Sequence, residues 1–427
     1  MRILFISDYF PPFTPGGAEW SSFYSAQALA KRGQVVTVLT PNYGRLPFRQ
    51  KVKGFWVIRP PFPYKLGKGQ KTLPFWVNNN LFYYLYFAFW IIKSFFQERP
   101  DLVHLQSRFA LPGVVLAKFF LRFKLVFTIR DTALFCPTGV CLQAGKIKKE
   151  YAQFSHFWQK CSQDYLRQYL EPESFWKRGY YRLTLFYFWF NTLVKRWCLK
   201  FCDQTVFISQ ALQGLYLKAG LVKRQKSKII YNLPPFSKYQ QARIKPAILK
   251  KKYKLNNKKV VLFVGRKTKG KGVEVLLKSA KEVYKKDKQA VFLFVGKGAV
   301  REKKDYLRDI ASVKHEELFG FYQQADLVVV PTLGFEPLGR VPIEAALFKR
   351  AVVVANSGGL PEQVINGKTG FIVPKGNFKR LSQVILRLLS NSKLREKIGQ
   401  NQQEYIQKKF AEEKIFQQTI SLYRSLE

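Results

Sequence analysis

Short apolar runs bounded by polar residues recur along the chain, and longer segments of helical character separate them. A continuous apolar run of this kind is typical of a strand that is buried on both faces of a parallel sheet. The runs lie at residues 1–8, 34–40, 100–107, 125–131, 204–209 and 258–265. Because strands that alternate with helices form doubly wound sheets, the pattern predicts an α/β fold.

The first strand and helix enclose a pair of glycines. The chain runs from the strand at 1–8 through Gly16 and Gly17 into a helical pattern from Trp20 to about Lys31. Two glycines at a helix start let the backbone approach a phosphate closely, although a plain tight turn would use the same residues. The loop lacks the full dinucleotide-binding fingerprint, so the sequence does not support an oxidoreductase.

A comparable unit opens the second half of the chain. The strand at 258–265 ends in Gly265, and a helix is predicted from about Val273. Arg266 and Lys271 stand across the turn between them, where a bidentate guanidinium and an ammonium could hold one anion. The sequence therefore predicts an anion site at this turn.

The length of 427 residues allows two domains, each with its own core. The Lys-rich stretch 238–259 contains no strand pattern, and we expect it to link them. The predicted boundaries are 1–235 for the first domain, 236–400 for the second, and 401–427 for a C-terminal helical segment.

The segment 334–344 holds two carboxylates separated by a glycine and two prolines. Its second proline, Pro342, fits the first turn of a helix. Glu336 should then lie on the loop before the helix, and Glu344 within its first turns. Gly339 between them lets the backbone approach a ligand closely.

The amides of Leu338, Gly339 and Arg340 precede this predicted helix. Unpaired N–H groups at a helix start, beside the positive end of the dipole, favour a phosphate. Carboxylates on either side accept hydrogen bonds from hydroxyl groups. An anion flanked by hydroxyls is the chemistry of a sugar nucleotide.

The chain is strongly basic, with 73 Lys and Arg against 27 Asp and Glu and a net charge of +46. Such a field predicts binding to polyanions, which are nucleic acid or an anionic membrane surface. Aromatic residues make up 16% of the chain and cluster in blocks with cations at the ends. That distribution favours a bilayer interface over nucleic acid, whose binding proteins intersperse single stacking rings among basic residues.

Two segments carry the aromatic blocks. Residues 81–92 are apolar without a break, and residues 177–197 place cations at both ends of an aromatic run. Since a spanning helix needs about 20 apolar residues, the first block is too short to cross a bilayer. Each block alone is at least as compatible with a buried helix. Together with the net charge, the pair predicts peripheral attachment to a membrane.

The chain begins directly with a strand, and the start shows no signal-peptide pattern. Its five cysteines do not suggest a secreted disulfide framework, so a reducing cytosol is expected. Cys136, Cys141 and Cys161 lack the paired spacing of structural zinc sites, and no metal is predicted. Cys198 and Cys202 are expected to share a helix face as packing residues.

The two-glutamate element, preceded by residues 325–332 and followed by 357–362, resembles the retaining GT-B glycosyltransferases of family GT4. The resemblance covers essentially the whole chain and is most specific in the C-terminal half. It implies two doubly wound domains facing a central cleft, with a last helix from about Glu412 to Leu426 that crosses back to the first domain. The donor would be a nucleotide-sugar with UDP or GDP, without metal or other cofactor.

The resemblance also implies roles for individual residues. Glu344 would accept the ribose hydroxyls, Glu336 a hydroxyl of the sugar, and the cations would stabilise the leaving diphosphate. The implied catalytic residues are Arg130, Asp131, Arg266, Lys271 and Glu336. The implied donor-binding residues are Gly16, Gly17, Gly265, Gly296, Leu338, Gly339, Arg340 and Glu344.

Two positions depart from the family pattern. Relatives usually carry a histidine where Arg130 stands, and a permanent cation cannot shuttle a proton. Relatives commonly end the helix after Glu344 with a glycine, where this chain has Lys349. His104 keeps the pattern, although a histidine that ends a buried strand is often a satisfied core residue.

The predicted activity is transfer of a sugar to a lipid-linked or cell-envelope saccharide acceptor, at the cytoplasmic face of the membrane. The alternative is a basic GT-B scaffold that binds nucleic acid or anionic lipid without catalysis. Glu336 and Glu344 argue against the alternative, because binding of a polyanion does not require carboxylates.

Overall fold

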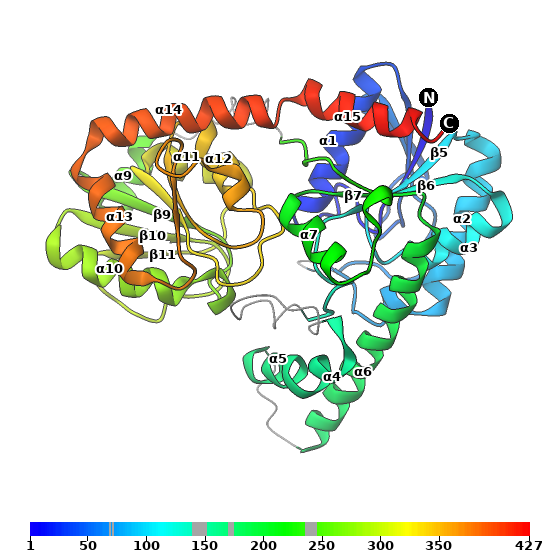
Figure 1. The fold of residues 1–427 in the computed structure, drawn as a ribbon, viewed down its shortest axis with the longest axis horizontal. Helices are drawn as coiled ribbons and strands as arrows, with labels where there is room; N and C mark the ends of the chain where they lie inside the picture. The colour runs from blue at the N-terminus through cyan, green and yellow to red at the C-terminus, as the bar shows by residue number, and fades with distance from the viewer. Residues whose placement is uncertain (68–69, 71, 139–151, 170–174, 235–245) are drawn as a thin grey trace. The chain divides into compact units, whose positions relative to one another are not determined.

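The computed structural model describes residues 1–67, 70, 72–138, 152–169, 175–234 and 246–427 (Figure 1). They form two compact units. The N-terminal unit consists of the described residues up to Pro234 together with Glu412–Glu427, and the C-terminal unit of the described residues from 246 to Ala411. Each unit is built on a mainly parallel sheet covered by helices, so the predicted fold class is confirmed.

The N-terminal unit has the strand order β3-β4-β2-β1-β5-β6-β7-β8, with only β3 antiparallel to its neighbour. The strands are β1 (Arg2–Ile6), β2 (Val35–Leu39), β3 (Arg49–Val52), β4 (Phe55–Ile58), β5 (Leu102–Leu105), β6 (Lys124–Ile129), β7 (Gln204–Phe207) and β8 (Ser227–Ile229). From β1 the chain first extends the sheet on one side and then, from β5, on the other. The strand order therefore reverses between β1 and β5, where open α/β sheets bind their ligands.

Helices on both faces complete this unit, and they include the last helix of the chain. They are α1 (Gly17–Lys31), η1 (Val77–Asn79), α2 (Leu81–Glu98), α3 (Leu111–Leu121), α4 (Phe154–His156), η4 (Phe157–Cys161), α5 (Ser162–Tyr169), α6 (Phe175–Cys198), η5 (Leu199–Phe201), α7 (Gln210–Lys218), η6 (Arg224–Lys226) and α15 (Glu412–Arg424). Arg32 after α1 pairs with Glu412 at 2.7 Å and Glu413 at 3.0 Å, which helps hold α15 on the N-terminal unit.

The C-terminal unit has the strand order β11-β10-β9-β12-β13-β14, all parallel. Its strands are β9 (Lys259–Val264), β10 (Ala290–Val295), β11 (Leu307–Ile310), β12 (Leu327–Val330), β13 (Ala351–Ala355) and β14 (Phe371–Val373). Its helices are α9 (Pro246–Tyr253), η7 (Lys269–Lys271), α10 (Val273–Lys286), α11 (His315–Gln324), α12 (Val341–Leu347), η8 (Pro361–Gln363), α13 (Phe378–Ser390) and α14 (Ser392–Lys409). Here the strand order reverses between β9 and β12.

The apolar runs became strands because both faces of the sheet are covered. On β9, Val261 and Phe263 belong to one core cluster, whereas Val260 and Leu262 belong to the cluster on the opposite face. A strand buried in this way needs apolar residues at every position, not at alternate ones.

The linker prediction for 238–259 is wrong for its second part. Residues 246–253 form α9, and Leu249 and Leu255 are buried in the core of the C-terminal unit. Lys250, Lys251 and Lys252 are exposed, and the apolar residues beside them supply the packing. The first part of the predicted linker, up to residue 245, lies outside the described residues. At its other end the C-terminal unit extends to Ala411 and not to residue 400, because α14 belongs to it.

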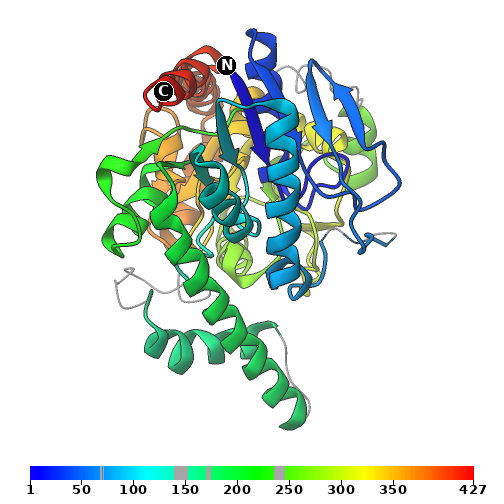
Figure 2. The same cartoon turned by 90° about the vertical axis from the view of Figure 1, so that its right-hand side faces the viewer.

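The two aromatic segments form α2 and α6 of the N-terminal unit, and each packs one side inward. Figure 2 shows α6 extending past the sheet of its unit, with α4 and α5 beside its first half. On α6, Leu185 and Trp189 are buried, whereas Phe186 and Phe190 are exposed. Among the described residues, no helix is long and apolar enough to span a membrane.

Candidate substrate-binding sites

In the C-terminal unit, three loops that follow neighbouring parallel strands are tied together. The N–H groups of Leu333 and Gly334, after β12, donate to the carbonyl of Gly270, after β9, at 3.0 and 2.9 Å. The N–H of Gly359, after β13, donates to the carbonyl of Glu336 at 2.8 Å. These loops lie at the carboxyl ends of the strands and beside the reversal between β9 and β12. The fold therefore places the candidate donor residues where an α/β sheet binds ligands.

Lys271 and Glu336 form an ion pair across this strand reversal. Their side chains remain 31% and 16% exposed, so both are accessible to a ligand. Lys271 was expected to act together with Arg266, which is exposed on the same turn. The ammonium instead neutralises one of the two predicted carboxylates. That pairing also orients Glu336 toward the turn after β9.

Glu344 lies in the first turns of α12 as predicted, but its side chain is only 3% exposed. One carboxylate oxygen accepts the hydroxyl of Tyr322 at 2.7 Å, and the other lies 3.5 Å from the Arg340 guanidinium. The partnership with Tyr322, on α11, was not foreseen. No local sequence pattern around Tyr322 predicts that its hydroxyl contacts Glu344 of α12.

Glycines allow the close approaches on which this edge depends. A Cβ on Gly296 would come within 2.0 Å of the carbonyl oxygen of Gly265, and both glycines have positive φ. A Cβ on Gly358 would come within 2.0 Å of the Glu336 carbonyl oxygen. Gly265 and Gly296 thus shape the backbone between β9 and β10. Their contact with a donor stays a prediction.

The loop before α12 is fixed by side chains from later in the sequence. The carbonyl of Leu338 accepts the side-chain amide of Gln363, and Leu338 itself is buried. Gly339 has φ of 81°, a conformation that favours glycine. The helix that follows runs only from Val341 to Leu347. Binding of a phosphate by the Leu338, Gly339 and Arg340 amides stays a prediction.

Lys267, between the two predicted cations, is buried and has a structural role. Its ammonium pairs with Asp309 and donates to the carbonyl of Ile310 at 2.8 Å. The basic residues of this turn therefore differ in function: Lys267 holds the strand ends together, while Arg266 and Lys271 face outward. Sequence alone did not separate them.

In the N-terminal unit, a hollow of ≈ 80 Å³ lies beside the reversal between β1 and β5. Its lining includes Arg130 and Asp131, the two predicted residues on the loop after β6. Gln106, Arg108 and Glu19 line it as well. Polar groups from β1, α1, β5 and β6 thus converge on one point of the sheet edge.

Arg130 is engaged with its own unit. Its guanidinium donates to the backbone carbonyl and the side-chain oxygen of Gln106, both at 2.6 Å, and to the Asn232 side chain at 3.3 Å. Burial lowers its pKa to about 10, so it remains a cation at neutral pH. The side chain joins the ends of β5 and β6 to the segment after β8.

Asp131 pairs with Arg108 and also accepts the Ala133 N–H at 2.9 Å. Its side chain is 44% exposed. Gly16 is the N-cap of α1 and Gly17 its first residue, so the helix begins before the predicted Trp20. The Gly16 N–H donates to the Glu19 carboxylate at 2.9 Å, and burial raises the pKa of Glu19.

Asp8, at the end of β1, was missed from the sequence. Its carboxylate accepts the N–H groups of Phe109 and Ala110, both at 2.9 Å, and the hydroxyl of Tyr83 at 3.1 Å. It therefore anchors the start of α3. Burial raises its pKa above the ordinary value for aspartate. A polar residue directly after a buried strand was the available signal.

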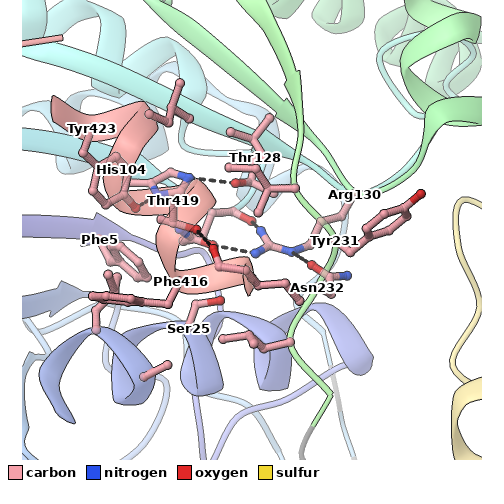
Figure 3. Close-up of a pocket in the computed structure, with 18 residues that line it drawn as sticks. Phe5, Ser25, His104, Thr128, Arg130, Tyr231, Asn232, Phe416, Thr419 and Tyr423 are labelled. Atoms are coloured by element: carbon pink, nitrogen blue, oxygen red, sulfur yellow. Dashed lines mark hydrogen bonds between the residues drawn. The ribbon is translucent and has the colours of Figure 1, made fainter. Parts of the chain in front are cut away.

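His104 is a satisfied core residue. Figure 3 shows its ring between Thr128 and Tyr423, with ring nitrogens 2.7 Å from the Thr128 hydroxyl and 2.5 Å from the Tyr423 hydroxyl. Burial, followed by the nearby Arg130 charge, lowers its pKa well below that of free histidine. His104 and Arg130 both line a second pocket of this unit, formed by α1, β5, β6, the segment after β8 and α15, and Figure 3 shows Arg130 directed at Asn232 within it.

Cys136, Cys161, Cys198 and Cys202 are buried. Cys198 ends α6, but Cys202 lies beyond the following 3-10 turn, so the expected shared helix face is wrong while the packing role holds. Cys141 lies outside the described residues. Within the described part of the chain, no cluster of His, Cys, Asp or Glu could hold a metal ion.

Family comparisons match both halves of the chain. Residues 15–233 match the family described as Glycosyltransferase Family 4, and residues 245–405 match Glycosyl transferases group 1. The capsular polysaccharide biosynthesis glycosyltransferase CapM of Staphylococcus aureus is 31% identical over 241 residues, which are 53% of this chain and 62% of CapM. Spore coat protein SA of Bacillus subtilis is 26% identical over 53% of this chain and 66% of its own length. Neither match spans two thirds of the relative.

Solved structures give the same fold over the full chain. HepE of Anabaena, in complex with UDP and glucose, aligns with a TM-score of 0.66 at 20% identity and covers 100% of both chains. The catalytic domain of starch synthase IV of Arabidopsis thaliana, bound to ADP and acarbose, aligns with a TM-score of 0.71 at 14% identity, covering 100% of this chain and 99% of that one. The chain therefore belongs to glycosyltransferase family 4 and has the GT-B fold.

Proposed function

We propose that this protein is a retaining glycosyltransferase that moves a sugar from a UDP- or GDP-sugar to a lipid-linked or cell-envelope saccharide. The observation that carries the proposal is the accessible Lys271–Glu336 pair at the strand reversal of the C-terminal unit. Membership of family 4 supports the activity, and a relative named for capsular polysaccharide biosynthesis supports the acceptor class. A neighbour solved with UDP and glucose supports the donor class.

In the proposed reaction, the bond between the anomeric carbon and the donor phosphate breaks, and a bond from that carbon to an acceptor hydroxyl oxygen forms. The acceptor proton passes to the leaving phosphate oxygen, so the products are a glycoside and a nucleoside diphosphate. Negative charge grows on the leaving group as its bond breaks. The cations of Arg266 and Lys271 would stabilise that charge most in the transition state.

The carboxylates would orient the donor. Glu344 is proposed to accept the ribose hydroxyls, which requires the Tyr322 hydroxyl to share or yield the carboxylate. Glu336 is proposed to accept a sugar hydroxyl while Lys271 turns toward the diphosphate. Gly16, Gly17, Leu338, Gly339 and Arg340 keep their proposed roles as backbone contacts to the phosphates.

Release of nucleoside diphosphate, measured over a panel of UDP- and GDP-sugars with membrane extract as acceptor, tests the activity. The anomeric configuration of the product, read by NMR, tests retention. We propose that the reaction needs no metal, so turnover should persist in EDTA. Loss of turnover that added magnesium restores would contradict this part of the proposal, and an absence of turnover with every donor would contradict the activity itself.

We propose further that the N-terminal unit attaches to the inner face of the membrane through α2 and α6. Both helices leave apolar side chains in solvent along one stripe. On α6 these are Tyr180, Leu183, Phe186 and Phe190; on α2 they are Leu81, Phe82, Leu85 and Phe89. Partial burial of such a stripe in the headgroup region, helped by the net charge, is the usual basis of peripheral binding.

Serine substitutions separate attachment from folding. Replacing Leu183, Phe186 and Phe190 together should abolish sedimentation with anionic vesicles and leave the melting temperature near the wild-type value. Trp189 is the contrasting position, since it is buried and stacks on Phe157 at 4.9 Å, so its replacement should lower the melting temperature. Unchanged sedimentation of the folded triple variant would contradict attachment through α6.

A further inference from the structure

The connections that lead into strands β5 to β8 carry exposed aromatic and basic residues. These parallel strands are neighbours in the sheet, so the segments before them lie in a row along its amino-terminal edge. The exposed aromatic residues there are Phe96, Phe119, Phe120 and Trp197. The exposed basic residues are Arg99, Arg122, Lys124, Lys200, Lys223 and Lys226. This edge is opposite the one that holds Arg130 and Asp131.

A hollow of ≈ 660 Å³ opens at this edge, beside the end of α6 and the starts of β7 and β8. Its volume falls within the range of ordinary ligand pockets. Its basic lining residues are Arg196, Lys200, Lys223 and Lys226. Its apolar lining residues include Trp197, Leu199, Leu221 and Val222. The lining thus combines cationic and apolar side chains.

The positive charge in this hollow is not balanced by its own walls. No carboxylate is among its described lining residues. Asp203, next to the lining residue Cys202, is already bonded to the Lys118 ammonium at 2.5 Å and the Leu125 N–H at 2.6 Å. Cations that converge without a counter-charge favour an anionic ligand.

The cations differ in their freedom to meet a ligand. The Arg196 guanidinium is engaged by the loop after β6, since it donates to the carbonyls of Leu134 and Phe135, both at 2.7 Å, and of Ala152 at 2.9 Å, so it is not available to a ligand at this edge. Lys200, Lys223 and Lys226 are exposed, and the contact of the Lys226 ammonium with the Cys202 carbonyl is a long one, at 3.5 Å. Each flexible stem can bring an ammonium to a phosphate oxygen, so three exposed cations suit a phosphate group.

The apolar lining continues onto the surface. Trp197 is 52% exposed and packs edge-on against Phe201, with 4.7 Å between the ring centroids. Phe201 packs in the same way against Phe119 of α3, with 4.9 Å between the centroids. A free inorganic anion would gain nothing from these rings. The glycerol and first acyl carbons of a phospholipid would bury against them.

We propose that this hollow binds the phosphate headgroup of an anionic phospholipid, with the start of its acyl chains on Trp197 and Leu221. The site is separate from the candidate donor and acceptor residues and does not depend on glycosyl transfer. It is also separate from the apolar stripe of α6, whose residues do not line it.

Calorimetry with dihexanoylphosphatidylglycerol, kept below its micelle concentration, tests the site on the full chain without a bilayer. Wild-type protein should bind this soluble lipid. Replacing Lys200, Lys223 and Lys226 together by glutamine should weaken binding about 10²-fold, because each basic residue near an anionic headgroup contributes about fivefold. Trp197→Ala should weaken it by a smaller factor while the melting temperature stays unchanged.

The matched control removes the same charge elsewhere. Lys281, Lys286 and Lys393 are exposed on α10 and α14 of the C-terminal unit, and their replacement by glutamine should leave lipid binding unchanged. Equal weakening in both triple variants would overturn the site in favour of general attraction. Equal affinity for inorganic phosphate would overturn the lipid as its ligand, and absence of lipid binding to the folded wild-type protein would overturn the proposal.

Discussion

The two units place polar side chains at equivalent points of their sheets, but use them differently. At the β1/β5 reversal of the N-terminal unit, Asp8 is saturated by backbone N–H groups and Arg130 by Gln106 and Asn232. At the β9/β12 reversal of the C-terminal unit, Lys271 and Glu336 bond each other and stay accessible. Asp8 thus joins the end of β1 to the start of α3, and Arg130 joins the ends of β5 and β6 to the segment after β8. The Lys271–Glu336 pair can exchange its mutual contact for contacts with a ligand.

The difference shows why position in the fold is not sufficient to assign a role. Both sites satisfy the topological rule for ligand binding in open sheets. An ion pair at a partly exposed position contributes little to stability, whereas an unsatisfied buried acceptor or donor costs much more. Substitutions in the two units should therefore separate function from folding.

The largest expected effect is on turnover. Lys271→Ala should lower kcat/KM about 10²-fold, as removal of a preorganised partner of a developing anion does, and Arg266→Ala should act in the same direction. Because the Lys271–Glu336 pair is partly exposed, urea unfolding should change by less than about 1 kcal/mol. Steady-state kinetics on the best donor give the measurement, and Lys269→Ala on the same turn is the control. Near-normal turnover in both variants would remove these residues from the mechanism.

The two proposed donor contacts can be tested separately with the variants Glu336→Gln and Glu344→Gln. Glu344→Gln should weaken binding of the free nucleoside diphosphate, whereas Glu336→Gln should spare it and lower transfer. Calorimetry with the nucleotide alone distinguishes them. Equal losses of nucleotide affinity in the two variants would contradict the division between ribose and sugar.

In the N-terminal unit the corresponding change should act on stability. Asp8→Asn sets an amide N–H₂ against the N–H groups of Phe109 and Ala110, and we expect a loss of about 2 kcal/mol in the free energy of unfolding. Asp131→Asn, at the same sheet edge but exposed, should change it by less than about 1 kcal/mol. Urea titration of both variants gives the comparison. An equal effect at the two positions would show that burial at this edge does not set the cost.

The buried Lys195 of α6 makes the stability of the N-terminal unit depend on pH. It is buried, donates to the Asn191 side chain at 2.7 Å, and lies near Arg108, Asp8 and Cys198. Burial, followed by the Arg108 charge, lowers its pKa to about 7 from an ordinary value of 10.5. Above pH 7 the unfolded chain therefore binds a proton that the folded chain does not, so stability rises with pH.

Between the lowered pKa of about 7 and the ordinary pKa of 10.5, the free energy of unfolding should rise by about 1.4 kcal/mol for each pH unit. The measurement is the difference in unfolding free energy between wild type and Lys195→Met at pH 7.5 and at about pH 8.5, which cancels the titration of other groups. A difference that stays constant with pH, or that changes in the opposite direction, would contradict the lowered pKa.

Sequence patterns predicted most strands because continuous apolar runs report burial on both faces. They failed where a single contact decides the structure. The helical pattern predicts a start of α1 at Trp20, because it does not reveal that the Glu19 carboxylate accepts the Gly16 N–H. The pattern does not predict α9, because the buried Leu249 of this helix is followed directly by the exposed Lys250, Lys251 and Lys252.

The candidate residues of the C-terminal unit were predicted, but their partners were not. Arg266 and Lys271 are close in sequence and were grouped for that reason, whereas Lys271 pairs with Glu336 of another loop. That pair forms because β9 and β12 are neighbours in the sheet. No local sequence pattern predicts the strand order. Asp8 was missed for the same reason, since its donors come from residues about a hundred positions away.

The smallest expected effect concerns the end of α12, the helix that follows the Lys271–Glu336 site. Lys349, just after this helix, takes the left-handed conformation, with φ of 54°, which favours glycine. Its N–H donates to the Ala346 carbonyl at 3.0 Å, and the N–H of Arg350 donates to that of Ala345 at 3.0 Å. The helix is thus closed with the usual hydrogen bonds despite the strained residue.

Lys349→Gly should stabilise the C-terminal unit by about 0.5–1 kcal/mol. Glycine removes about 1–2 kcal/mol of strain that the left-handed conformation imposes on lysine. Two smaller effects oppose this gain, because glycine makes the unfolded chain more flexible and removes a cation near the helix end. Lys281→Gly, at an exposed interior position of α10, is the control and should destabilise by about 1 kcal/mol. Urea unfolding of both variants should therefore show shifts of opposite sign. A destabilised Lys349→Gly would mean that the lysine contributes more at the helix end than its conformation costs.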